Sequence, residues 1–313
     1  MSLYGRRIID RIKHAFSHRL TLPVPPYHTP AYWEKVYSQL DENDVFEWGD
    51  INLESQLKSF SYNINQEHTN EIRKVYGENI ANRSTLQQEG QMDFHNVLFQ
   101  DNHVTLGQNN HTKNDEIERS TILILGCGNS RLGEDILHYY IDMGPYSIDK
   151  MDKALPPRLV QCDISTHVVN SMTKRYHKYV EKDLMSIVQD DATQFTLIND
   201  ESVDSVVDKG LVDALFCAEQ GGMVQQVMGN VHRTLKAGKV FMFFSFSRPE
   251  YLLQHTAQRS DGKVEDVGKN DVLWSDVDIL ELNEIFIYRF VKAGSDTSRR
   301  RHKKKKHKRR ISR

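Results

Sequence analysis

The chain has few cysteines and no long apolar run. Its 313 residues include three cysteines, Cys127, Cys162 and Cys217. Their spacing fits neither a disulfide framework nor a metal site, which indicates reduced, buried thiols in an intracellular protein. No apolar segment approaches the roughly 18 residues that a membrane-spanning helix needs. The longest one, Val240–Phe246, is typical of a core strand, so we expect no contact with a membrane.

Charge is distributed unevenly along the chain. The net charge is −2, yet residues 299–313 hold 11 Lys or Arg and no acid, whereas residues 1–298 hold 30 bases and 43 acids. Such a basic stretch cannot bury a core, and we expect a disordered tail. It is either a nuclear signal or handle for RNA and ribosomes, or a solvated run that offsets the acidic body.

Composition divides the chain into five expected segments. The first twenty residues are basic and amphipathic, which is typical of a surface helix or, alternatively, of a mitochondrial presequence. A proline-rich linker follows, and then a short helix over 31–40. The segment rich in Asn, Gln, His and charge is expected to be an insertion of loop or weak helix rather than a domain. The segments are 1–29 (N-terminal segment and linker), 30–62 (cofactor lid), 63–118 (polar insertion), 119–293 (main domain) and 294–313 (basic tail).

Strands and helices alternate after residue 119. This alternation predicts an α/β, Rossmann-like fold with a mostly parallel sheet. Two strand-like runs at the end, 277–282 and 285–292, are separated by two residues and predict a hairpin whose last strand is antiparallel. The other expected strands are 121–126, 158–163, 186–190, 203–208 and 239–246. The expected helices lie near 131–142, 166–180, 211–217 and 219–235, the last one closed by Lys236-Ala237-Gly238 as a C-cap.

The first of these strands ends in a glycine turn. Ile122–Leu125 is apolar, and Gly126-Cys127-Gly128 follows directly. Two glycines let the backbone approach a ligand closely, and the next helix offers free N–H groups. The NAD fingerprint needs a third small residue where this chain has Arg131, so a dehydrogenase is disfavoured. The alternative ligand of such a turn is S-adenosylmethionine.

Carboxylates follow the next three strands. Each alone is typical of an N-cap or turn, but the carboxyl ends of parallel strands meet at one edge of the sheet. Asp163 is expected to accept hydrogen bonds from both ribose hydroxyls, and Asp191 from the adenine amino group, with Ala192 leaving room for the ring. Asp208-Lys209 is expected beside the sulfonium.

Several motifs together resemble a known family. They are Leu125–Ser130, Asp163-Ile-Ser165, Val207–Leu215, Tyr32–Tyr37 and Phe46-Glu47-Trp48. They are similar to motifs of the methyltransferase-like class I protein lysine methyltransferases, which include enzymes acting on elongation factor 1-alpha and, more distantly, on citrate synthase. The resemblance covers roughly residues 30–50 and 120–292, and departs from the family where Leu211 replaces a threonine.

The resemblance implies a seven-stranded methyltransferase fold, S-adenosylmethionine as cofactor and a lysine-bearing protein as substrate. It also implies that Trp33, Tyr37 and Trp48 close over the cofactor. The residues that would complete the pocket are Gly126, Gly128, Asp163, Ile164, Asp191, Ala192 and Lys209.

Two carboxylates are candidates for catalysis of methyl transfer to an amine. Asp208 is placed to orient the amine or relay its proton, and Asp213, one helical turn on, is second. Two other functions remain open: methylation of a nucleic acid or small molecule, with the basic tail binding RNA, or a non-catalytic binding protein anchored by that tail. We expect a cytoplasmic or nuclear protein, or a mitochondrial one if residues 1–20 are a presequence. The sequence does not indicate an oligomeric state.

Overall fold

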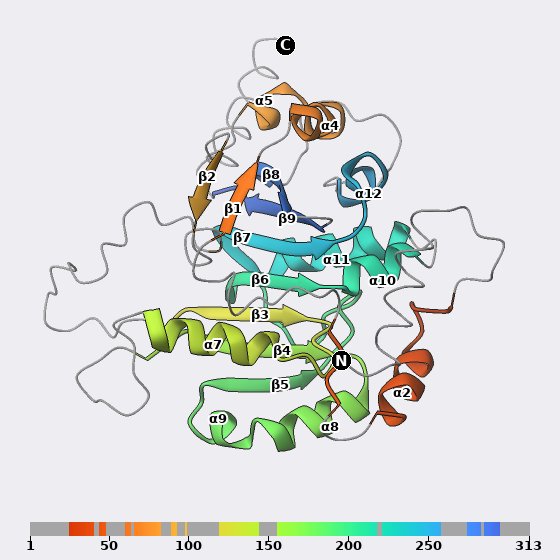
Figure 1. The fold of residues 1–313 in the computed structure, drawn as a ribbon, viewed down its shortest axis with the longest axis vertical. Coiled ribbons are helices and arrows are strands. Elements are labelled where there is room, and N and C mark those ends of the chain that lie inside the picture. The colour runs from red at the N-terminus through yellow and green to blue at the C-terminus, as the bar shows by residue number, and fades with distance from the viewer. Residues whose placement is uncertain are drawn as a thin grey trace, which may run out of the picture.

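A nine-stranded mixed sheet forms the centre of the computed structural model (Figure 1). Its order is β2 (Glu89–Met92), β1 (Phe60–Asn63), β8 (Trp274–Leu282), β9 (Ile285–Lys292), β7 (Leu235–Ser245), β6 (Val203–Lys209), β3 (Thr121–Leu125), β4 (Arg158–Asp163) and β5 (Met185–Gln189). The structure describes residues 25–40, 44–47, 60–63, 66–82, 89–92, 98, 119–143, 155–217, 221–257, 274–282 and 285–294.

The five strands β7, β6, β3, β4 and β5 are parallel, and β9 runs antiparallel to β7. The predicted Rossmann-like fold with a terminal antiparallel hairpin is therefore confirmed. The chain moves from β3 outward to β4 and β5, then returns to place β6 on the other side of β3. This reversal between β3 and β6 is the switch point where open α/β sheets bind ligands.

Helices cover both faces of the sheet, because the central strands are apolar on both sides. In β3, Ile122 and Ile124 pack on one face, while Leu123 and Leu125 pack on the other. The first face carries α2 (Pro30–Ser38), α7 (Leu132–Met143), α8 (Thr166–Arg175) and α9 (His177–Glu181). The second carries α4 (Gln66–Tyr76), α5 (Glu78–Ala81), α10 (Leu211–Cys217), α11 (Gly221–Thr234) and α12 (Pro249–Thr256).

Part of the segment expected as a polar insertion joins this architecture. Helix α4 buries Ile72 and Tyr76, which are four residues apart on one helix face, against the second face of the sheet. The Tyr76 hydroxyl hydrogen-bonds Thr256 Oγ1 at 2.8 Å. Strands β1 and β2 extend the sheet beyond β8 through antiparallel pairing. Seven strands form the expected fold, and these two short ones are added at its edge.

The start of β7 differs from the expectation. Lys236-Ala237-Gly238 was expected to cap the preceding helix, but α11 ends at Thr234 and β7 begins at once with Leu235. Gly238 has a φ of +76°, in the stretch where the pairing of β6 with β7 shifts register between Val203 and Ser205. The glycine thus serves an irregularity in the strand, because this φ is costly for other residues.

The expected N-terminal amphipathic helix and the basic tail lie outside the described residues. Among the helices that are described, none combines the length and apolarity needed to cross a membrane.

Candidate active site

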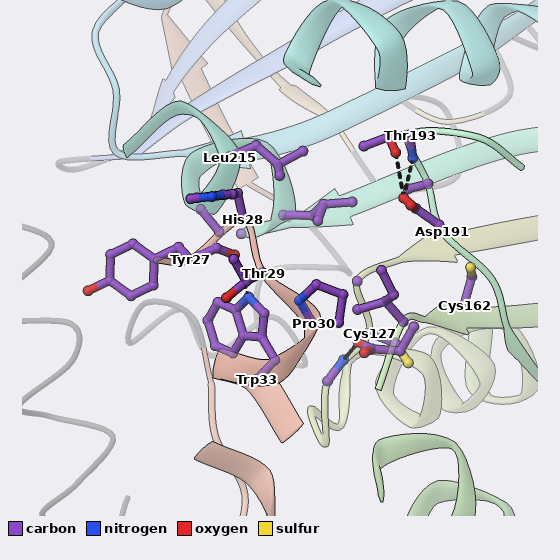
Figure 2. Close-up of a pocket in the computed structure, with 18 of the residues that line it drawn as sticks. Tyr27, His28, Thr29, Pro30, Trp33, Cys127, Cys162, Asp191, Thr193 and Leu215 are labelled. Atoms are coloured by element: carbon purple, nitrogen blue, oxygen red, sulfur yellow. Dashed lines mark hydrogen bonds between the residues drawn. The ribbon is translucent and has the colours of Figure 1, made fainter. Parts of the chain in front are cut away.

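A pocket opens at the carboxyl ends of β3, β4, β5 and β6, beside the switch point. The empty space in it amounts to about 960 Å³, including space that is open to solvent. Residues 25–40 and 44–47 of the N-terminal segment cover it: in Figure 1, α2 stands beside the arrowheads of these strands. Figure 2 shows Tyr27 and Trp33 of this segment on one side of the pocket, with Asp191 and Thr193 on the other.

The glycine turn forms the base of the pocket. Gly126 and Gly128 both have a φ of +51°, a backbone conformation that favours glycine. A β-carbon on Gly126 would lie 2.8 Å from Leu211 Cβ, and one on Gly128 would lie 2.3 Å from the Tyr37 hydroxyl oxygen. Both positions therefore need glycine for two reasons, conformation and space.

Asp163 ends β4 and faces the pocket beside this turn. Its Oδ2 accepts a hydrogen bond from Gly128 N at 2.8 Å, and its Oδ1 accepts one from Ser165 N at 2.9 Å. Burial raises the pKa of Asp163 to about 6, although these backbone N–H groups act in the opposite direction. An ionised carboxylate has about four acceptor sites, so Asp163 retains acceptor capacity for a ligand.

The turn after β5 lines the other side of the pocket. Asp191 Oδ1 accepts hydrogen bonds from Thr193 N and Thr193 Oγ1, at 2.8 and 2.7 Å (Figure 2). Its neighbour Asp190 is more buried and accepts from Leu197 N and from both the amide and hydroxyl of Thr196. Ile164 and Ala192 also line the pocket. The loop is thus held by its own two aspartates.

A column of aromatic rings covers the pocket from the N-terminal segment. Trp33 stacks between Tyr27 and Tyr37, with ring centroids 5.9 and 5.8 Å away. Trp33 Nε1 donates a 2.6 Å hydrogen bond to Tyr27 O, which fixes the indole orientation. Trp33 and Tyr37 lie four residues apart on α2 and so share one face of the helix.

Two glutamates fasten the N-terminal segment to the sheet. Glu34 accepts hydrogen bonds from Ser165 Oγ and from Thr166 N and His167 N, the free backbone donors at the start of α8. Glu47 accepts from Lys209 Nζ and Ser130 Oγ, both at 2.7 Å, and from Arg131 N at 2.8 Å. Through these hydrogen bonds, the two glutamates anchor the N-terminal segment over the pocket.

Asn129 provides a third anchor for the N-terminal segment. Asn129, next to the second turn glycine, accepts a 2.8 Å hydrogen bond from Phe46 N and donates a 2.7 Å bond to Asp44 O. Residues 44–47 are therefore paired along their length with the turn that follows β3.

The end of β6 contributes Lys209 and the buried Asp208. Lys209 lines the pocket. Asp208 is fully buried, and its two oxygens accept hydrogen bonds from Leu211 N and Val212 N at 2.8 and 2.9 Å. Burial raises the pKa of Asp208 to about 7. The residue fixes the start of α10, and it is not among the residues that line the pocket.

Asp213 occupies a similar position one turn later. Its carboxylate accepts hydrogen bonds from the hydroxyls of Ser245 and Ser247 and from Phe246 N, and it has no exposed surface. It ties α10 to the end of β7. Neither of the two expected catalytic carboxylates lines the pocket, and backbone and serine donors hydrogen-bond their oxygens.

The structure brings nine of the ten expected cofactor residues to this pocket, and the tenth, Trp48, lies outside the described residues. The nine are Trp33, Tyr37, Gly126, Gly128, Asp163, Ile164, Asp191, Ala192 and Lys209. Glu34, Glu47 and Asn129 were not expected to matter, although Glu34 and Glu47 stand inside the two aromatic motifs. No group of residues suited to holding a metal ion occurs in the described part of the chain.

Comparison with known proteins adds a sequence relationship. No family model matches the chain. Curated proteins named eEF1A lysine and N-terminal methyltransferase are similar to it: the Bos taurus protein is 30% identical over 137 residues, and the Danio rerio protein is 32% identical over 120 residues. The resemblance expected from the motifs is confirmed. These matches cover 43% and 38% of this chain but only 17% and 15% of the relatives, so the chain spans about a sixth of their length.

Solved structures resemble the chain only weakly. TrmN from Thermus thermophilus is 11% identical, with a TM-score of 0.35 over 56% of this chain and 44% of that one. A geranyl diphosphate C-methyltransferase from Streptomyces coelicolor, solved with S-adenosyl-L-homocysteine, is 14% identical, with a TM-score of 0.28 over 40% and 38% of the two chains. At these TM-scores the likeness carries no weight, and the fold rests on the strand order of the sheet.

Proposed function

We propose that the chain is an S-adenosylmethionine-dependent methyltransferase whose acceptor is an amine of a protein, in the first place a lysine side chain. One observation carries the proposal: a glycine turn, a strand-end aspartate and two stacked aromatic side chains line one pocket at the switch point of the sheet. The names of the curated relatives support the reaction and the lysine acceptor.

The residues of the pocket fit the cofactor by their chemistry. Gly126 and Gly128 line the pocket, and because they carry no side chains their backbone can approach a nucleoside closely. Asp163 would accept hydrogen bonds from the ribose hydroxyls, and Asp191 with Ala192 would take the adenine. Trp33 and Tyr37 line the pocket, and an aromatic ring beside a sulfonium would attract it through a cation–π contact. We assign the cofactor-binding role to these residues and to Gly126, Gly128, Ile164 and Lys209, with Trp48 as an expected addition.

When bound, S-adenosylmethionine supplies an activated methyl group on its sulfonium. The tasks left to the chain are to align the acceptor nitrogen with that group and to exclude water. Leu211, Leu215 and Met223 give part of the pocket an apolar wall, which lowers the pKa of an amine that enters and so favours its neutral, nucleophilic form. Asp208 and Asp213 would support this wall by holding α10, while their direct catalytic role stays a prediction.

The test is transfer of labelled methyl groups to purified eEF1A and to a cell extract. We expect label in protein, located on lysine by mass spectrometry, and no loss of label after ribonuclease treatment. Label on the amino terminus of the acceptor would assign the second activity named for the relatives. Asp163→Ala should abolish transfer, whereas the exposed Asp200→Ala should retain it.

Two outcomes would redirect the proposal. Label that disappears with ribonuclease would favour a nucleic-acid methyltransferase, for which the basic run at 299–313 is the supporting observation. Binding of cofactor without any transfer, to extract or to small molecules, would favour a binding protein. We propose a cytoplasmic or nuclear location: a cytoplasmic one would agree with an elongation-factor substrate, and a nuclear one with the basic run at 299–313.

A further inference from the structure

A single cationic side chain, Lys209, stands in a pocket that we propose for a cationic cofactor. Among the described residues that line the pocket, it is the one Lys or Arg. Its side chain is only 4% exposed, so water screens its charge poorly. S-adenosylmethionine also carries a positive sulfonium, and a lysine acceptor arrives as an ammonium. An uncompensated ammonium here would oppose both.

Glu47 is the group that compensates this charge. Its Oε2 lies 2.7 Å from Lys209 Nζ, and its side chain is 23% exposed. The preceding residue, Asp208, also carries a carboxylate, but its oxygens accept hydrogen bonds from Leu211 N and Val212 N. Burial alone would raise the pKa of Glu47, but the Lys209 ammonium and the hydrogen bonds at the glycine turn hold it below its usual value.

Glu47 does not line the pocket itself but reaches Lys209 from the covering segment. It also accepts hydrogen bonds from Ser130 Oγ and Arg131 N, at the turn that follows β3. One carboxylate therefore joins the cover, the glycine turn and the end of β6. The charge of Lys209 is therefore balanced by a residue 162 positions away in sequence.

We propose that Glu47 is a positioning residue that neutralises Lys209 and thereby makes the pocket selective for a positively charged ligand. This inference rests on the proposed function, since the ligand in question is S-adenosylmethionine. It adds a property that the pocket residues alone do not give: discrimination between the cationic sulfonium substrate and the uncharged thioether of the product, S-adenosylhomocysteine. The product would then leave more readily than the substrate.

The test compares the dissociation constants of these two ligands by calorimetry, for the full chain and its variants. In Glu47→Gln, the buried Lys209 ammonium is left without its counter-charge. We expect the affinity for S-adenosylmethionine to fall about tenfold or more, and that for S-adenosylhomocysteine to fall much less. The ratio of the two constants is the readout, because a merely structural role of Glu47 would weaken both ligands alike.

Two further variants separate charge from anchoring. Lys209→Met in the Glu47→Gln background removes the unpaired cation, and we expect it to restore the wild-type ratio. Asn129→Ala loosens the same covering stretch through Phe46 N and Asp44 O without changing any charge. It should weaken both ligands in equal proportion and leave the ratio unchanged.

The outcomes distinguish this inference from the proposed function. If the wild type binds neither ligand, the proposed function fails. If the wild type binds both and Glu47→Gln leaves their ratio unchanged, the proposed function stands and the inference is overturned. Equal weakening of both ligands by Lys209→Met alone, with no change in ratio for any variant, would instead assign Lys209 to the carboxylate that the two ligands share.

Discussion

A β-carbon on Gly128 would lie 2.3 Å from the hydroxyl oxygen of Tyr37, so the glycine turn and helix α2 fit together only because residue 128 has no side chain. The two residues come from segments that are 91 positions apart in sequence, and the close approach brings the covering segment down onto the base of the pocket. Any side chain at position 128 must push Tyr37 away.

Gly128→Ala should therefore weaken the binding of S-adenosylmethionine by about tenfold or more, since it displaces Tyr37 and strains the backbone. Gly238→Ala is the matched control. Gly238 also has a positive φ, +76°, but a β-carbon there would meet nothing within 4 Å. Calorimetric titration of both variants should show lost affinity only for Gly128→Ala; equal affinity in the two would show that the contact with Tyr37 does not shape the pocket.

The buried aspartates predict how stability depends on pH. The pKa of Asp163 is raised to about 6 and that of Asp208 to about 7, both above the ordinary value of 3.8. Between about pH 4 and 7 the folded chain thus binds more protons at these sites than the unfolded chain does. The free energy of unfolding should fall as pH rises through this window.

Asp208→Asn should flatten this fall, by up to about 1.4 kcal/mol per pH unit for one site. Urea unfolding at several pH values between about 4.5 and 7.5 gives the free energy of unfolding and hence its slope against pH. The control is Asp200→Asn, which makes the same substitution at an exposed position. A slope that stays the same in Asp208→Asn would mean that this carboxyl does not take up a proton in the folded chain at these pH values.

Glu34 should hold the covering helix in place. Its carboxylate satisfies the backbone donors of Thr166 and His167 at the start of α8, where a negative charge is favourable. Glu34→Ala should speed hydrogen exchange of the α2 amides by about tenfold, corresponding to a loss of about 1–2 kcal/mol of local stability. Glu78→Ala, at an exposed residue of α5, serves as the comparison. If the exchange rates of the α2 amides stayed unchanged, Glu34 would not be an anchor of this helix.

Asp213 is predicted to stabilise the junction between α10 and the end of β7. Asp213→Ala leaves the buried Ser245 hydroxyl and Phe246 N without their acceptor, which should cost about 2–4 kcal/mol of the free energy of unfolding. Urea unfolding gives this value, with Asp200→Ala expected within about 0.5 kcal/mol of wild type. If Asp213→Ala instead kept full stability and lost methyl transfer, the residue would belong to the catalytic groups after all.

The sequence was sufficient for the central sheet because its strands are short apolar runs that end in distinctive residues. Ile122–Leu125 before Gly126, and Asp163 as the last residue of β4, were placed from local pattern alone, and β6 was expected to end at Asp208, one residue before its end at Lys209. Strands β1 and β2 carry no such pattern: their sequences, FSYN and EGQM, are short and largely polar. They join the sheet through hydrogen-bonded pairing of β1 with β2 and β8, and such pairing cannot be recognised from the local sequence.

The anchors of the covering segment could not be predicted for a related reason. A glutamate's partners are invisible in sequence when they lie far away, and those of Glu34 and Glu47 lie more than 80 residues along the chain. The surroundings of Asp208 and Asp213 could not be predicted either. Backbone and serine donors that only the fold supplies hydrogen-bond their oxygens, and their catalytic role stays a prediction.

The measurement that tests the account most directly is a calorimetric titration of S-adenosylmethionine into the wild-type chain and into Asp163→Ala. The account predicts saturable binding at one site by the wild type and loss of that binding in the variant, with both chains folded. A folded wild type that binds no S-adenosylmethionine, or a variant that binds it as tightly as the wild type, would contradict the assignment of this pocket.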